Sequence, residues 1–107
     1  MYAAIRQYEL GAGSVPDFMH TTEAGFAKTL SELPGFVGYH LVATGSDEIV
    51  SLTFFRDEES AARSNELAAQ FVSSGLQQFQ LNLTSAMSGE VYVSRVATAV
   101  ETVGQPA

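Results

Sequence analysis

The stretch LPGFVGYHLVATGSDEIVSLTFFRDEESA, residues 33–61, decides the fold. It opens on Pro34-Gly35, a pair that is typical of the end of a helix. Two runs with alternating side chains follow, residues 36–44 and 49–55, and they predict two strands. The residues Gly-Ser-Asp-Glu that separate them are typical of a hairpin loop.

A helix is predicted on each side of this hairpin. Before it, apolar residues recur at steps of three and four over about five turns, which is the pattern of one buried helix face. They are Val15, Phe18, Met19, Thr22, Phe26, Leu30 and Leu33. Ser14 and Pro16 mark the beginning of this helix, and Asp57 caps the second one. The inner face of the second helix is expected to carry Ala61, Ala62, Asn65, Ala68, Ala69 and Val72.

The two ends of the chain complete the sheet. Residues 2–10 and 89–99 alternate as strands, and residues 73–88 are expected to form a short helical turn and a loop. The order β-α-β-β-α-β predicts a ferredoxin-like α+β fold, in which both helices cover one face of a four-stranded antiparallel sheet. We expect a single domain over residues 1–103 and a flexible tail over 104–107.

The helices leave the other face of this sheet uncovered. Tyr2, Arg6 and Tyr8 share one side of the first strand, and we assign them to the uncovered face together with Phe36 and Phe55. An exposed apolar patch of that kind marks an interface. The sequence therefore predicts a homodimer whose two sheets face each other and enclose a cavity.

Composition excludes several classes of function. The 107 residues contain 5 Lys and Arg against 12 Asp and Glu, which gives a net charge of −7 and disfavours nucleic acid as a partner. There is no Cys, so disulfides and thiolate metal sites are excluded. No apolar run is long enough to cross a membrane, and the first residues lack the pattern of a signal peptide. We expect a cytoplasmic protein.

Residues 33–39 and 53–61 together resemble the antibiotic biosynthesis monooxygenase family, which belongs to the dimeric α/β-barrel proteins. The similarity covers most of residues 2–98. It implies a dimer with a pocket either between each sheet and its helices or within the barrel. In the best-known members, that pocket oxidises polycyclic phenols with molecular oxygen and neither metal nor flavin. Phe55 stands where the oxygenases commonly have Trp, and Ser64-Asn65 stands where a His often lies. Haem is therefore disfavoured, and no cofactor is expected.

Two residues are candidates for catalysis. Arg6 has the planar, permanently charged group that holds an anionic or enolate oxygen, although an ion pair with a neighbouring acidic residue would also explain it. His40, expected on the same face as Phe36, is the candidate general base because its ordinary pKa lies near neutrality. Its alternative is a half-buried imidazole that is satisfied by a carbonyl or by water.

Other residues are candidates for binding a ligand: Tyr39, Ser51, Thr53, Phe55 and Asn65. Tyr39 presents a hydroxyl on an apolar body, which suits a phenolic ligand or core packing. Asn65 either ties the second helix to a loop or orients a ligand, because a buried amide must find partners. The two histidines lie in different elements without paired carboxylates, so no metal site is predicted.

Two functions remain open. The first is a cofactor-independent monooxygenase that acts on a small aromatic or quinone-like molecule. The second is a binding or interaction module of the same fold, which the departures at Phe55 and Asn65 favour. Nothing in the sequence is diagnostic of a third possibility, a structural stress protein.

Overall fold

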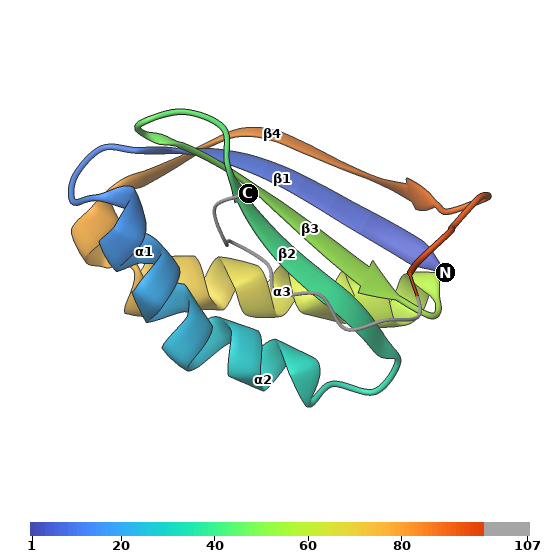
Figure 1. Cartoon of the computed structure of the whole chain (residues 1–107). Coiled ribbons are helices and arrows are strands. Elements are labelled where there is room, and N and C mark those ends of the chain that lie inside the picture. Colours follow the sequence, from blue (N-terminus) through green and yellow to red (C-terminus); the bar gives the residue numbers. More distant parts are fainter. Residues whose placement is uncertain (98–107) are drawn as a thin grey trace.

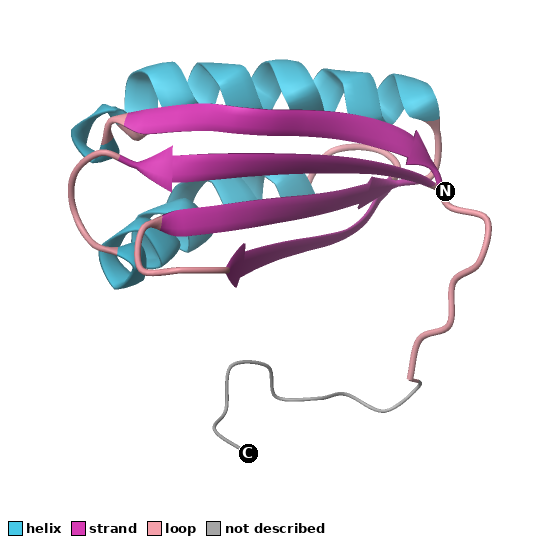
Figure 2. Ribbon diagram, turned by 90° about the horizontal axis from the view of Figure 1, so that it is seen from above, coloured by secondary structure: helices cyan, strands magenta, loops and turns pink. Residues whose placement is uncertain are grey.

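The computed structural model describes residues 1–97, which form one antiparallel sheet with all of its helices on a single face (Figure 1). The strands lie side by side in the order β2-β3-β1-β4 (Figure 2). Their bounds are β1 Tyr2–Leu10, β2 Phe36–Ala43, β3 Glu48–Phe55 and β4 Leu81–Glu90. This arrangement confirms the predicted ferredoxin-like fold. The domain boundary after residue 103 and the tail at 104–107 lie outside the described residues.

The first helical segment consists of three consecutive pieces, α1 (Val15–Thr22), the π-helical η1 (Glu23–Ala27) and α2 (Lys28–Ser31). The hydroxyl of Ser14 caps it by accepting a hydrogen bond from the amide of Asp17. Its buried residues are spaced by four: Phe18, Thr22, Phe26 and Leu30. Four residues slightly exceed the α-helical turn of 3.6 residues, so the wider π turn keeps this stripe on one face. The predicted stripe is confirmed.

Helix α3 (Glu58–Gly75) packs against β1 and β3. The carboxylate of Asp57 caps it by accepting from the amide of Ser60 at 2.7 Å. Its buried residues are small, which lets the helix approach the sheet closely: Ser60, Ala61, Ser64 and Ala68. The predicted inner face was wrong in part, because Ala62, Asn65 and Ala69 are exposed.

A glycine corner joins the first helical segment to the sheet and to α3. Gly35 has φ +81°, and a Cβ there would lie 2.8 Å from the hydroxyl of Ser60. Its carbonyl accepts from the amide of Arg56 at 2.8 Å. Residues 33–39 and 53–61 thus belong to one structural junction, which is why the two motifs occur together.

The prediction for the last strand was wrong. After η2 (Gln77–Phe79), β4 occupies Leu81–Glu90 and pairs with β1, while residues 91–97 form no regular element. Residues 98 and 99 of the predicted strand lie outside the described part of the chain. The sheet keeps four strands because the polar segment 81–90 supplies the fourth.

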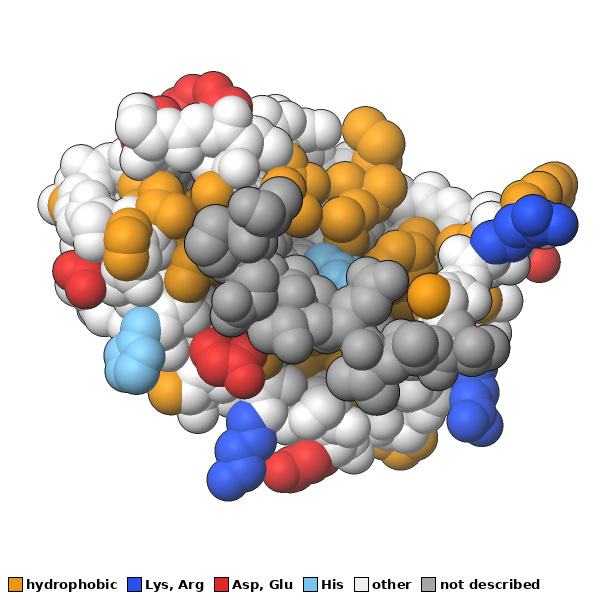
Figure 3. Space-filling view, viewed as in Figure 1, with side chains coloured by type: hydrophobic (Ala, Val, Ile, Leu, Met, Phe, Trp, Pro, Cys, Tyr) orange, Lys and Arg blue, Asp and Glu red, His pale blue; other side chains and the backbone are white. Residues whose placement is uncertain are grey.

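The assignment of the sheet faces was also wrong. The residues assigned to the uncovered face lie beneath the helices, and the alternate residues lie on the uncovered face. Arg6 and Tyr8 are buried beneath the helices, and Phe55 is fully buried, packed edge to face on Phe36. Tyr2 also packs in that core. The uncovered face carries the alternate residues, and its apolar members are Ala3, Ile5, Val42, Val50, Leu52, Phe54 and Met87. In the view of Figure 3, hydrophobic side chains gather on the upper half of the visible surface, and most of the charged groups lie nearer its outline.

Candidate functional site

Arg6 is the central residue of the site. It projects from β1 toward the helices and is only 8% exposed. Its guanidinium donates a hydrogen bond to Oδ1 of Asn65 on α3. Within residues 1–97, the one ion pair is the surface contact between Arg63 and Glu59, so no carboxylate lies within salt-bridge distance of Arg6. A buried cation with a neutral partner is costly unless another group neutralises it.

A groove runs between α3 and β4, with Arg6 and Asn65 in its floor. It consists of two adjoining hollows of about 310 and 270 Å³. We call it the α3–β4 groove, and it is lined by Ala4, Arg6, Tyr8, Asn65, Ala68, Ala69, Val72, Ser73, Leu83, Ala86, Met87 and Ser88. The groove is therefore apolar along its walls and cationic at its floor.

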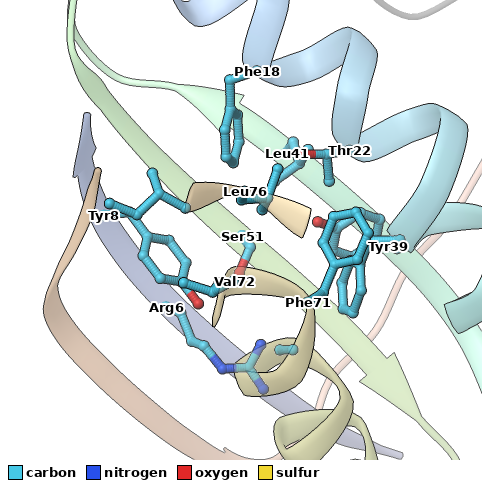
Figure 4. A pocket seen from close by; sticks show the side chains of 13 residues that line it. Arg6, Tyr8, Phe18, Thr22, Tyr39, Leu41, Ser51, Phe71, Val72 and Leu76 are labelled. Carbon is cyan, nitrogen blue, oxygen red and sulfur yellow. The ribbon is translucent and has the colours of Figure 1, made fainter. Parts of the chain in front are cut away.

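A smaller hollow, the inner cavity, lies behind Arg6 and Tyr8, between the sheet and the helices (Figure 4). Its volume is about 30 Å³, and the surface of its wall is almost entirely carbon. It is lined by Arg6, Tyr8, Phe18, Thr22, Phe26, Tyr39, Leu41, Ser51, Ala68, Phe71, Val72, Leu76 and Leu81. Arg6, Tyr8, Ala68 and Val72 border both spaces, so the inner cavity and the groove meet at these residues.

Two tyrosines contribute neutral hydroxyls to this region. Burial raises the pKa of Tyr8 above 10.0, and the charge of Arg6 opposes part of that shift. Burial also raises the pKa of Tyr39, while Tyr8 and Glu23 add to the effect and Arg6 opposes it. Both phenols therefore stay protonated near neutral pH, and neither is a base there.

Three buried hydroxyls have no hydrogen-bond partner among the described residues: those of Thr22, Ser51 and Thr53. Thr22 and Ser51 belong to the wall of the inner cavity, whereas Thr53 is buried away from it. Their oxygen atoms are almost completely covered, so they contribute little polar surface to the cavity.

The structure brings together some of the residues that the sequence singled out. Arg6, Tyr39 and Ser51 line the inner cavity, and Asn65 meets Arg6 at the groove. Thr53 and Phe55 also lie on the face of the sheet that the helices cover, but neither lines the groove or the inner cavity.

His40 does not join them. An irregularity between Phe36 and Gly38 in β2 puts Phe36 on the helix side, so His40 lies on the uncovered face. There it is exposed and packs against Phe54, with the sheet between it and Arg6. Among residues 1–97, no cluster of three acidic or imidazole side chains forms a metal site.

Sequence reasoning missed Tyr8 as a site residue and assigned it to an interface. The signal was present, since Tyr8 lies two residues after Arg6 on one strand and must share its face. The aromatic wall formed by Phe18, Phe26 and Phe71 gave no separate signal, because a stripe that lines a cavity has the same spacing as a stripe that fills a core.

A family model described as antibiotic biosynthesis monooxygenase matches residues 1–73. The chain belongs to this family. The family match includes β1, the first helical segment, the β2–β3 hairpin and most of α3, which together supply Arg6, Tyr8 and Asn65. No curated protein matches the sequence significantly.

Solved structures with the same fold share little sequence with this member of the family. HapK from Hahella chejuensis is 16% identical, with a TM-score of 0.67, over 92% of this chain and 100% of its own. A dimeric ferredoxin-like protein from an uncultured marine organism is 10% identical, with a TM-score of 0.67, over 90% and 98%. A point mutant of MhuD, solved with two manganese protoporphyrin IX bound per active site, is 20% identical, with a TM-score of 0.61, over 91% and 100%. These likenesses establish the fold alone.

Proposed function

We propose that this protein is a cofactor-independent monooxygenase that binds a small aromatic molecule with one acidic oxygen in the α3–β4 groove. The observation that carries the proposal is the buried guanidinium of Arg6, which has a neutral partner and no carboxylate within salt-bridge distance among the described residues. An anionic oxygen of a ligand would supply the missing charge, and a guanidinium binds such an oxygen through short, charge-assisted hydrogen bonds.

The groove has the size and chemistry of a site for such a ligand. Its larger hollow, about 310 Å³, falls at the lower end of the range for small-molecule pockets. Ala69, Val72 and Leu83 would contact the apolar body of the ligand, while Arg6 at the floor fixes its orientation. Tyr8 lines the same hollow and adds a neutral hydroxyl to this end of the groove.

In the proposed reaction, the bound molecule has a CH₂ group made acidic by an adjacent phenol or carbonyl. Arg6 stabilises the anion that forms when this group loses a proton to water in the open groove. The carbanion gives its electrons to dioxygen and forms a carbon–oxygen bond. Loss of water then leaves a carbonyl, so that R₂CH₂ and O₂ become R₂C=O and H₂O. One oxygen atom enters the product and the other leaves as water.

The groove and the inner cavity offer no imidazole to haem. The chain has two histidines, and both His20 and His40 are exposed and line neither the groove nor the inner cavity. An axial imidazole is therefore missing from the space in which a porphyrin would have to lie.

The experiment uses anthrone, whose oxidation to anthraquinone follows the stoichiometry above. We expect oxygen consumption and a product with one added oxygen and two fewer hydrogens by mass spectrometry. Arg6→Met removes the cation and abolishes the activity. Arg63→Met removes an exposed arginine of α3 and retains it. Equal rates in the wild-type protein, Arg6→Met and buffer would overturn the proposal.

A second candidate, binding without turnover, is favoured by a different observation. No Asp, Glu or His lines the groove or the inner cavity, so the described site lacks a general base of its own. If the protein is such a binding module, we expect naphtholates to raise the melting temperature of the wild-type protein but not that of Arg6→Met, and we expect no consumption of anthrone.

We also propose that the protein acts as a homodimer through its uncovered sheet face. Ile5, Leu52 and Phe54 lie there side by side, and Val42 and Met87 remain 41% and 61% exposed. A second copy of the same face is the partner of matching chemistry. The dimeric ferredoxin-like relative supports this assembly at the level of the fold.

A further inference from the structure

The inner cavity differs from the groove in a way that the binding of an aromatic molecule does not explain. Its volume of about 30 Å³ is far below the volume of about 310 Å³ of the adjoining hollow of the groove. The cavity therefore suits a much smaller guest than the groove does.

The wall of the cavity suits a nonpolar guest. Phe18, Leu41, Phe71 and Leu76 supply carbon surface, and the oxygens of Thr22 and Ser51 are covered. A buried water needs two to four polar partners, and a cavity that lacks them stays dry. Dry cavities lined by Leu, Ile and Phe take up xenon, which makes this gas a probe of apolar cavities.

The cavity also has the right position. It borders the groove at Arg6, Tyr8, Ala68 and Val72, which is the end of the groove where the substrate anion would lie. We infer that the inner cavity holds dioxygen beside that anion, an inference that rests on the proposed function. The held molecule would be the O₂ that accepts the electrons of the carbanion, forms the new carbon–oxygen bond and leaves its second atom as water.

Xenon tests the cavity without any turnover. In the wild-type protein under xenon pressure, we expect methyl resonances of Leu41, Val72, Leu76 and Leu81 to shift. Thr22→Leu adds carbon at the wall and should abolish these shifts. Thr22→Val removes the hydroxyl while it keeps the volume, and should retain them. Ser51→Val is a second filling variant if Thr22→Leu does not fold.

The kinetic test separates the gas from the organic substrate. Thr22→Leu should raise the KM for oxygen several-fold and leave the Kd of the aromatic ligand unchanged, whereas Ala62→Leu, on the exposed side of α3 and outside the cavity wall, should change neither. Absence of xenon shifts in the wild-type protein would overturn the inference and leave the proposed function standing. An unchanged KM for oxygen in Thr22→Leu would also overturn the inference and leave the proposed function standing. Failure of anthrone oxidation in the wild-type protein would remove both proposals.

Discussion

The guanidinium of Arg6 is buried at a cost to stability that a ligand can offset. Replacing a buried ion pair by apolar residues of similar volume is often neutral or stabilising by roughly 1–4 kcal/mol, and Arg6 has no ionic partner among the described residues whose charge would be left behind. We therefore expect Arg6→Met to unfold at the same or a higher urea concentration than the wild-type protein, although it loses the ligand. A clear loss of stability would mean that the hydrogen bond from Arg6 to Asn65 stabilises the fold. Arg6 would then have a structural role and would not be kept for binding a ligand.

Tyr39 makes stability depend on pH in alkaline solution. Burial raises its pKa in the folded protein above the ordinary value of 10.0, so the unfolded chain loses this proton first as pH rises. The free energy of unfolding is therefore unaffected by Tyr39 below pH 10.0 and falls above it. Urea unfolding on both sides of this pH should show a smaller fall for Tyr39→Phe. Tyr92→Phe, which alters an exposed tyrosine, is the control, and an equal fall in both variants would refute the assignment.

At the scale of single residues, the sequence singled out Arg6 for its permanent charge, Tyr39 for the hydroxyl on its apolar body and Ser51 as a polar group on a strand that lines the barrel. It did not predict that His40 and Arg6 lie on opposite faces of the sheet, since the irregularity of β2 between Phe36 and Gly38 leaves no trace in the alternation of side chains. Such a bulge is a local feature, but it shifts every following residue of the strand to the other face.

At the scale of elements, the α3–β4 groove is the route by which a ligand would reach Arg6. Ala69 borders this groove on the helix side and is exposed. We expect Ala69→Trp to weaken ligand binding at least tenfold, as measured by fluorescence titration, with little change in melting temperature, because the indole fills the groove without entering the core. Ala62→Trp is the matched control: it lies two turns earlier on the same exposed side of α3 and lines neither the groove nor the inner cavity. Equal binding by both variants would argue against this route.

The helices and the β2–β3 hairpin could be predicted from sequence because their caps and turns are local. The last strand could not. Residues 81–90 are rich in Ser, Asn and Thr, as suits an edge strand with exposed side chains, whereas residues 91–96 have the β-branched alternation of a buried strand. Pairing with β1 decided between them, and pairing depends on register rather than on local preference.

At the scale of the whole molecule, the sheet has two apolar faces, and sequence alternation alone does not say which one the helices cover. The structure shows that Phe54 lies on the uncovered face, so a substitution there tests the homodimer. Phe54→Asp puts an unpaired carboxylate on the uncovered face, which should weaken the dimer by ~3 kcal/mol or more, about a hundredfold in Kd. Sedimentation should then detect folded monomers.

Two further variants are controls for Phe54→Asp. Phe55→Asp should unfold the protein, because Phe55 is fully buried beneath the helices. Ala62→Asp, on the exposed side of α3, should leave a folded dimer. A wild-type protein that sediments as a monomer at tens of micromolar would rule out the sheet-to-sheet assembly.

The alternation of β1 and β3 also constrains how related sequences can vary in length. Ile5 and Arg6 are neighbours in the chain, yet one belongs to the uncovered face and the other to the floor of the groove; Ser51 and Leu52 divide in the same way. Loss or gain of one codon inside either strand would turn the cation outward and an aliphatic group inward. We therefore expect insertions and deletions among natural relatives to occur in the turns at residues 11–14 and 44–47, and to be absent from β1 and β3.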